Sequence, residues 1–508
     1  MSRPKIQPRQ TEVPFKAEDL IFSTTDHKGY IRSADEVFVQ MSRYPLGDML
    51  GQPHSMVRHP DMPRCVFGLF WDYINQSKPI GAYIKNIASD GSYYNVFALA
   101  TPLEDGYLSV RLKPTTTYFK TAHAIYKQLL DLETKLAGEG KSTVQCIEAS
   151  SKLLVTLLQE NGFKSYDAFM YRAFEEEMRS RDKEIHKTYR CNLWELNALS
   201  PSKVMRGKPD AATLAVLHAE RACTVAGKSF EQISSLLALQ TSLDNNARGI
   251  MRVADTLGMS SINVSLEATR LGEHGRCLSV IASHLGETTQ TIKSLADSLQ
   301  TQIGITSHSL GSAVFRLAST RLQAETMLAF SRKVRTPSAA AQPTSQDLLG
   351  TYPRQQVGAM LGDLQYSIKQ LSASLRPTIT GLIQDLCRLE SDITNVKRAM
   401  LTLRFAQLGG KIESARLSDD ASVITLIESI GTEIISTVRK ISELESDRLF
   451  VGSDLKAAFR QFDDLSATLD KSPKIQIQPN PPVSPSEITT SLPMVGPSTI
   501  SMTSTCFC

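Results

Sequence analysis

The strongest constraint on the fold is a helical pattern of apolar residues that runs almost without interruption over residues 209–335. One clear interruption lies at residues 270–276, where two glycines stand among charged residues. About 60 residues lie on each side of it, so each helix would be about 90 Å long at about 1.5 Å per residue. Two long helices of matched length around a glycine-containing turn predict an antiparallel helical hairpin.

A second helical stretch is predicted at residues 354–470, after a linker at residues 336–353 that holds prolines and three consecutive alanines. We expect this stretch to kink or restart at Pro377 and to be interrupted near residues 418–420. Residues 473–508 carry five prolines near their start and then become rich in serine and threonine. This composition is typical of a disordered tail.

The two helical stretches are similar to each other around their turns. Residues 266–271 read LEATRL and residues 412–417 read IESARL, and the two turns follow directly. This weak internal repeat indicates that the second stretch is a diverged copy of the first hairpin. Two hairpins joined at their base ends would let one chain form a four-helix bundle. The alternative is a homodimer.

Residues 19–115 differ in character from everything that follows them. Short β-like runs, turn signals such as Asp90-Gly91 and Asp105-Gly106, and many of the tyrosines lie here. The order is two strands, short helices and three more strands, with Ser33 and Glu36 as the capping box of the first helix. The pattern predicts an α+β domain with a five-stranded antiparallel sheet and helices on one face.

Residues 118–205 are predicted to form a helical connector of about three amphipathic helices, broken by glycines. Within it, the run from Glu175 to Lys187 is dense in charge. Such a run is typical of a helix face that is solvated and carries pairs at i,i+4 spacing, so we expect these side chains to be exposed.

Composition excludes several classes of protein. Lys and Arg number 56 against 52 Asp and Glu, a net charge of +4, which is too small an excess for a dedicated nucleic-acid binder. The 8 cysteines are scattered without a C-x-x-C pair, so we expect reduced thiols and no zinc site. No signal peptide or apolar stretch of about 18 residues is present, which predicts a cytoplasmic protein without a transmembrane segment.

The run from Gly51 to Pro63, GQPHSMVRHPDMP, resembles the PAS domain of bacterial aerotaxis receptors. The residues 23–26, 38–40 and 85–86 follow the same family pattern, and the resemblance covers about 90 residues of 508. It implies a PAS fold that binds FAD without a covalent bond and reports the redox state of the cell. It also implies six flavin-binding positions: His54, Arg58, His59, Asp61, Trp71 and Asn86.

The chemistry of these residues suits such a pocket. Arg58 offers a planar fork of donors, Trp71 a ring to cover a flat ligand, and Asn86 both a donor and an acceptor. His59 and Asp61 would form a polar pair at the mouth. Structural roles remain open for four of these residues: Trp71 as part of the core, Asp61 as a helix cap, and Arg58 and Asn86 as surface or turn residues. Haem ligation is a further alternative for His54 or His59.

Residues 262–276, INVSLEATRLGEHGR, resemble the hairpin tip of methyl-accepting chemotaxis proteins. In that family the tip docks a chemotaxis histidine kinase and its coupling protein, and two hairpins pair into a four-helix bundle. The resemblance implies a partner-binding role for five residues of the tip: Glu267, Arg270, Gly272, Glu273 and Arg276. The alternative is that the glycines only allow the turn and the charges only keep it soluble.

Together these features predict a cytosolic signal transducer, in which a PAS-bound flavin senses a redox or oxygen-type stimulus and a chemoreceptor-like helical region acts on a chemotaxis kinase pathway. A cofactor-free PAS interaction module on a coiled-coil scaffold is the second hypothesis, and a flavoprotein oxidoreductase is the third. The sequence shows no nucleophile–base constellation, phosphate loop or metal cluster, so we expect no catalytic residues, no metal and no enzymatic turnover.

Overall fold

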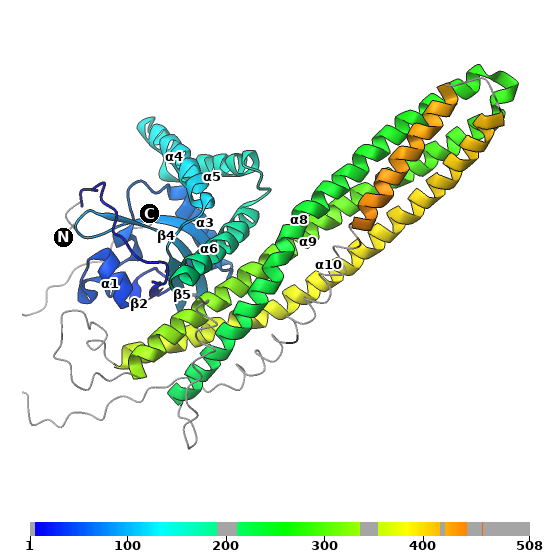
Figure 1. The fold of residues 1–508 in the computed structure, drawn as a ribbon. Coiled ribbons are helices and arrows are strands. Elements are labelled where there is room, and N and C mark those ends of the chain that lie inside the picture. Colours follow the sequence, from blue (N-terminus) through cyan, green and yellow to red (C-terminus); the bar gives the residue numbers. More distant parts are fainter. Residues whose placement is uncertain are drawn as a thin grey trace, which may run out of the picture.

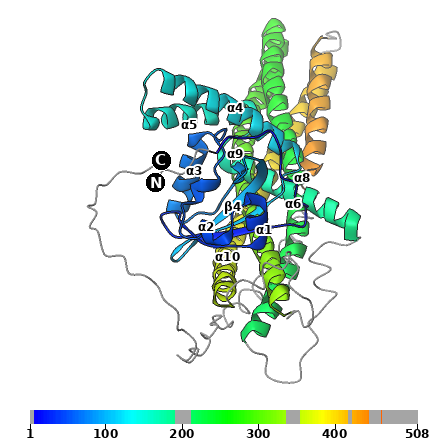
Figure 2. The same ribbon diagram turned by 90° about the vertical axis from the view of Figure 1, so that its left-hand side faces the viewer.

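The computed structural model describes residues 6–189, 211–335, 354–416 and 422–443, with the single residues 445 and 460. In Figures 1 and 2 an α+β domain lies beside one half of a long helical rod, and the tip of the rod extends away from it. The linker predicted at residues 336–353 and the tail predicted at residues 473–508 lie outside the described residues.

The domain is built on one antiparallel sheet of five strands in the order β2-β1-β5-β4-β3. This confirms the predicted α+β fold class. The strands are β1 (Ile21–Thr25), β2 (Ile31–Ala34), β3 (Ile80–Ile87), β4 (Tyr93–Leu103) and β5 (Gly106–Leu112). Between β2 and β3 lie α1 (Glu36–Ser42), α2 (Leu46–Met49), the 3₁₀ helix η1 (His54–Val57) and α3 (Arg64–Asn75).

The capping box predicted at Ser33 is wrong, because β2 continues through this residue. The Ser33 hydroxyl lies 2.6 Å from that of Thr24 on β1. Asp35 caps α1 instead, accepting a hydrogen bond of 2.9 Å from the Phe38 amide. The same Oδ1 atom accepts from the Phe22 amide at 3.0 Å, so one buried carboxylate joins the helix start to the sheet.

Both faces of the sheet are covered. On one face, Phe38 of α1 and His54 of η1 contact Arg111 of β5. The other face meets helices that come later in the chain: Phe97 stacks on Phe174 at 5.1 Å, and Phe22 meets Phe330 edge-on at 5.1 Å. A sheet buried on two sides loses the alternation between apolar and polar positions that marks a solvated face.

Three helices follow the sheet: α4 (Thr117–Gly138), α5 (Thr143–Glu160) and α6 (Tyr166–Tyr189). The prediction that the charged run of α6 is solvated is wrong in its first half. Glu175, Glu177 and Arg181 are only 0–2% exposed, because α6 lies between the sheet and the rod. Glu177 accepts hydrogen bonds from the Tyr83 hydroxyl at 2.8 Å and from the Thr115 amide at 2.7 Å.

The rod begins with the hairpin predicted over residues 209–335. It consists of α8 (Ala211–Arg270), the 3₁₀ turn η2 (Gly272–Gly275) and α9 (Arg276–Arg335), and each long helix has 60 residues. Both tip glycines are needed. Gly272 has a φ of +56°, and a Cβ at Gly275 would lie 1.9 Å from the Ala268 carbonyl oxygen.

The third long helix, α10 (Arg354–Arg416), continues through Pro377 without a break in its assignment, so the predicted restart does not occur. The neighbours Leu375 and Ile379 are fully buried. Tertiary packing against the rod thus offsets the hydrogen bond that proline cannot donate.

Beyond the second turn, residues 422–443 are helical again. In the distal half of the rod their apolar side chains share one core with α8, α9 and α10, represented by Leu257, Ile292, Val396 and Ile430 (Figure 1). The helical segments that share this core all belong to the described parts of one chain. The turn itself, at residues 417–421, lies outside the described residues.

Candidate functional site

The interior of the α+β domain holds a group of buried polar side chains on one face of the sheet. Asn86 of β3 and Tyr94 of β4 are paired in register, and Arg111 of β5 is opposite Ala98 of β4. Because strand positions alternate between faces, Asn86, Tyr94 and Arg111 point to the same side. They are 2%, 0% and 3% exposed.

Arg111 is a cation inside this interior. Its Nη2 atom lies 2.9 Å from the Ser23 hydroxyl and 2.6 Å from His54 Nε2, and its guanidinium carbon is 4.9 Å from the centre of the Phe38 ring. Burial lowers the pKa of Arg111 to about 10, so the side chain is still charged at neutral pH. Burial, and then the charge of Arg111, lower the pKa of His54 to about 3. His54 is therefore neutral and accepts the bond from Arg111.

Several buried polar atoms here find no hydrogen-bond partner within the described part of the chain: Arg111 Nη1, Tyr94 OH, Asn86 Nδ2 and His59 Nε2. Folded proteins satisfy about 90% or more of their buried polar atoms. A cluster of unsatisfied atoms in one small domain therefore indicates a polar guest, either a ligand or ordered water.

The side chains of His59, Asp61 and Lys85 lie close to one another. Asp61 Oδ2 lies 2.6 Å from Lys85 Nζ and 3.4 Å from His59 Nδ1. The His59 Nδ1 atom accepts from the Asp61 amide at 3.1 Å, which leaves Nε2 as the protonated donor. Burial, and then Lys85, lower the pKa of His59. His59 is therefore neutral at pH 7.

The helix cap considered for Asp61 is supplied by another residue. Glu133 of α4 accepts hydrogen bonds from the first amides of α3, those of Arg64 at 2.8 Å and Cys65 at 3.0 Å. A carboxylate at a helix N-terminus interacts favourably with the helix dipole. Asp61, more than half exposed, is thus free of this structural role and lies at the edge of the domain.

The structure does not bring Arg58 and Trp71 into the buried group. The Arg58 guanidinium lies 4.1 Å from the Phe67 ring centre and donates to the Met62 carbonyl at 3.2 Å. Trp71 is 39% exposed and meets Tyr107 edge-on at 5.7 Å. Of the six predicted residues, His54 and Asn86 therefore join this interior group, and the buried His59 contacts the exposed Asp61. Arg58 is bridged to Asn86 through its backbone, but its side chain and that of Trp71 contact other residues.

Sequence reasoning missed Tyr94 and Arg111. In β5 the polar residues Ser109 and Arg111 alternate with Leu108, Val110 and Leu112, which predicts a half-buried strand with Arg111 in solvent. The helices η1 and α1 cover that face and bury Arg111. This burial follows from the tertiary structure alone. The one sequence signal for this site was a basic residue, Arg111, between apolar residues of a strand.

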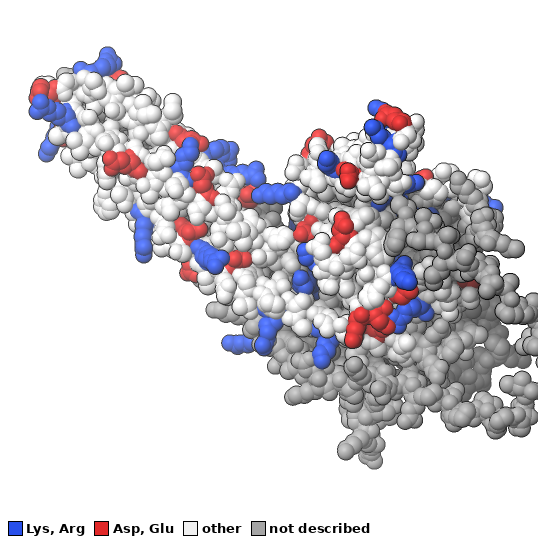
Figure 3. Space-filling model, turned by 180° about the vertical axis from the view of Figure 1, so that it is seen from behind, with Lys and Arg blue, Asp and Glu red and all other residues white. Residues whose placement is uncertain are grey.

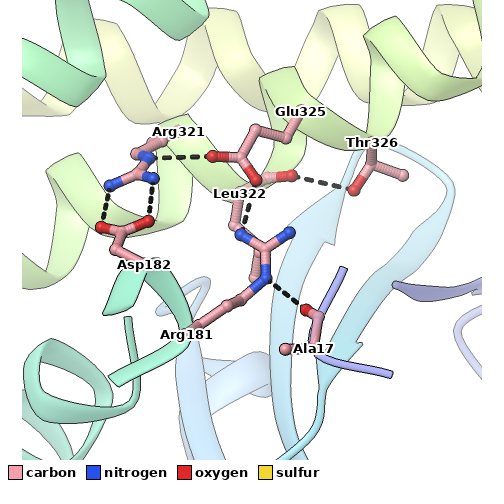
Figure 4. A network of polar contacts seen from close by, with 7 residues as sticks. All are labelled: Ala17, Arg181, Asp182, Arg321, Leu322, Glu325 and Thr326. Atoms are coloured by element: carbon pink, nitrogen blue, oxygen red, sulfur yellow. Dashed lines mark hydrogen bonds and ion pairs between the residues drawn. The ribbon is translucent and has the colours of Figure 1, made fainter. Parts of the chain in front are cut away.

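A second group of buried charges joins the domain to the rod (Figure 4). Glu325 of α9 lies 2.6 Å from Arg181 and 2.8 Å from Arg321. Arg321 also bonds Asp182 of α6 at 2.8 Å, and Arg181 donates to the Ala17 carbonyl at 2.8 Å. Burial opposes the charge of Glu325, but the two arginines hold its pKa below the usual value. Every charge in this group is thus balanced by a partner from another element.

The rod also forms a direct hydrogen bond with the sheet. Gln323 of α9 donates to the Thr101 hydroxyl of β4 at 2.8 Å. Thr101 lies on the same strand as Tyr94. The strand that carries one of the unsatisfied groups is therefore bonded to the long helix that runs to the tip.

No protein-family model matches the chain. Over 125 residues in the PAS-like N-terminal region, the chain is 37% identical to the aerotaxis receptor of Escherichia coli strain K12. The match covers 24% of this chain and 25% of that receptor, so the chain spans about a quarter of its relative's length. This confirms the resemblance seen in the sequence.

A solved structure that matches part of this chain is the light state of the blue-light photoreceptor Aureochrome1 LOV. It is 23% identical, matches 20% of this chain and 87% of that one, and has a TM-score of 0.19. Within the described ranges, no helix has a stretch apolar and long enough to cross a bilayer. The same ranges place no three His, Cys, Asp or Glu residues together as metal ligands.

Proposed function

We propose that this protein is a PAS-based signal transducer whose N-terminal domain binds a flavin, FAD, and whose rod acts on a chemotaxis kinase pathway. The observation that carries the proposal is the set of unsatisfied buried donors inside the region that is 37% identical to an aerotaxis receptor. When bound, the flavin would supply a ring whose charge and hydrogen bonding change with its redox state.

Residues of this chain would hold the flavin and transmit its state to the rod. Asn86, Tyr94 and Arg111 would hold the ring from the sheet, and His54 would orient Arg111. The opposite face of the sheet rests on α6 and α9. A change in the strands would therefore alter their packing on α9 and shift the population of rod conformations.

Analysis of the purified full chain for a released chromophore tests the flavin. We expect a yellow protein that releases FAD on denaturation, in an amount comparable to the protein, identified by chromatography and absorbance. A colourless chain that also fails to take up added FAD would contradict the proposal and favour the cofactor-free adaptor. Steady oxidation of a reduced nicotinamide would favour the oxidoreductase.

The tip is proposed as the docking site for the kinase and its coupling protein. It carries exposed ion pairs, Arg276 with Glu273 at 2.7 Å and Arg270 with Glu267 at 3.2 Å, and Figure 3 shows both charge signs gathered there. Exposed apolar side chains lie beside them: Ile262, Leu266 and Val280, 55–70% exposed. Charged groups around apolar residues are typical of protein interfaces.

Replacing Glu273 by alanine separates docking from stability. Exposed ion pairs contribute about 0–1 kcal/mol, so we expect the melting temperature to stay nearly unchanged. Capture of the coupling protein on immobilised chain should fall severalfold. Asp255→Ala is the matched control, because Asp255 forms an exposed pair of 2.7 Å with Lys293 away from the tip. Equal capture by both variants and the parent would exclude docking through this pair.

A further inference from the structure

Three aromatic rings meet at the surface of the α+β domain, near the start of β5. Trp71 of α3 and His27, in the turn between β1 and β2, each meet the Tyr107 ring edge-on, at 5.7 Å and 5.6 Å between ring centres. We call these three rings the aromatic patch. Trp71 and His27 are exposed, and Tyr107 is half-buried. Tryptophan is highly buried on average, so an exposed one beside a tyrosine indicates a surface that binds a partner.

The backbone of the domain holds the patch in one arrangement. Gly29 has a φ of +81°, and a Cβ at this position would lie 3.5 Å from two atoms of the Trp71 ring, so the indole packs closely on the turn. The Tyr107 hydroxyl donates to the Asn75 side chain of α3 at 3.4 Å. Rings fixed in this way lose little conformational freedom when a partner binds.

A segment of this chain carries a repeat that suits such a surface. Pro479, Pro482 and Pro485 are three residues apart, and Pro473 stands at twice this spacing before them. A polyproline II helix has three residues per turn, so these prolines would share one edge of it. Segments of this kind dock on aromatic side chains, and their preformed backbone lowers the entropy cost of binding.

We infer that the aromatic patch docks this chain's own proline-rich segment, residues 473–485, as a polyproline II helix. Successive prolines of the repeat would be about 9 Å apart, at about 3.1 Å per residue. The outer rings, Trp71 and His27, are no more than about 11 Å apart, because each lies within 5.7 Å of Tyr107. Two successive prolines therefore fit the patch. The inference goes beyond the proposed function and requires no flavin.

The charges on the two sides are complementary. The residues directly next to the three rings in the chain include two acids, Asp26 and Asp72, and one base, Lys28. Residues 471–485 carry two bases, Lys471 and Lys474, and no acid. The opposite excess of charge orients the segment as it approaches the patch.

The chain is long enough for the segment to reach the patch. Residues 422–443 return along the rod from its tip toward the half beside the domain (Figure 1). Pro479 follows residue 443 by 36 positions, and an extended chain of this length spans about 120 Å. This exceeds the length of a 60-residue rod helix, which is about 90 Å. The tether also keeps the segment at a high effective concentration, so a weak contact is enough.

The fluorescence of Trp71 reports docking in the full chain. The chain has 2 tryptophans, so Trp194→Phe leaves Trp71 as the single emitter. In this background, quenching by acrylamide is compared with and without the double change Pro482→Ala and Pro485→Ala, at equal flavin content. We expect the quenching constant to rise about twofold in the double variant, because loss of the segment uncovers the indole. An unchanged constant would overturn the inference.

Amide hydrogen exchange gives a second measurement that does not need Trp194→Phe. Exchange over residues 26–30, in the turn that carries His27, should be faster in the double variant than in the parent chain, because the turn loses its cover. Equal exchange in the two chains would contradict docking at this surface.

Pro481→Ala with Pro493→Ala is the matched control, because neither proline is in phase with the three-residue repeat. This variant makes the same kind and number of substitutions, and its quenching constant should stay near that of the parent. An equal rise in both double variants would exclude docking through the repeat.

His27→Ala tests whether the segment lies on the patch. The ring contact of His27 is with Tyr107, so its removal should affect Trp71 mainly through the segment. We expect the quenching constant to rise in the parent background and to stay unchanged in the double variant Pro482→Ala and Pro485→Ala, because both changes remove the same interaction. Equal rises in both backgrounds would place the segment elsewhere.

Dilution distinguishes docking within one chain from docking between two copies. A tethered segment should protect Trp71 to the same extent after about tenfold dilution of the protein. Loss of protection on dilution would assign the contact to the segment of a second copy and refute docking within one chain.

Discussion

The Glu325→Ala chain is expected to lose about 3–5 kcal/mol of unfolding free energy, because removal of one partner from a buried ion network leaves charges without compensation. Glu325 is the shared acceptor of Arg181 and Arg321, and these arginines are 1% and 0% exposed. Urea unfolding followed by circular dichroism measures the loss. A change below about 1 kcal/mol would show that the arginines find other partners or water.

Glu325→Gln is the companion variant, since it keeps the shape and removes the charge. We expect it to lie between the parent and Glu325→Ala. Lowering the pH should have a similar effect on stability, because protonation also removes the charge of Glu325. The folded-state pKa of Glu325 is below its unfolded value of 4.5, so this carboxylate contributes stability above about pH 4.5, and the contribution is lost as pH falls through the folded pKa.

The same variant tests the coupling of the domain to the rod. Glu325 and Arg321 belong to α9, whereas Arg181 and Asp182 belong to α6. If this contact transmits the state of the domain, FAD-dependent changes in amide hydrogen exchange along α9 should disappear in Glu325→Gln while FAD still binds. Exchange changes equal to those of the parent would assign transmission to Gln323 and the aromatic contacts.

Gly275→Ala is expected to open the tip of the hairpin. An added Cβ would lie 1.9 Å from the Ala268 carbonyl oxygen, so the backbone of the turn has to move. Such overpacking costs about 1–3 kcal/mol. We expect faster hydrogen exchange over residues 262–281 and loss of coupling-protein capture, with the α+β domain unaffected.

Gly258→Ala controls for the substitution itself. Gly258 lies within α8, and the nearest atom to its added Cβ is a methyl group of Thr289 at 3.8 Å, an ordinary contact. Alanine is favoured over glycine inside a helix by about 1 kcal/mol. This variant should therefore be more stable than the parent. Protection of the tip in Gly275→Ala equal to that of the parent would show that the turn accommodates a side chain.

Local patterns in the sequence determined much of this molecule. Alternating apolar residues and the turns at Gly91 and Gly106 predicted the strands, and both glycines have positive φ angles that side chains disfavour. Helical periodicity with glycines at 272 and 275 predicted the hairpin. These features depend on residues that are near each other in the chain, so a sequence pattern records them.

The tertiary structure alone decided which charges are buried. The run beginning at Glu175 has the pattern of a solvated face, yet α6 lies between the sheet and α9, and the partners of Arg181 and Asp182 are more than 130 residues away in sequence. Arg111 likewise has the alternation of an exposed position. Pairing at such separations depends on how the elements pack together, which local periodicity does not encode.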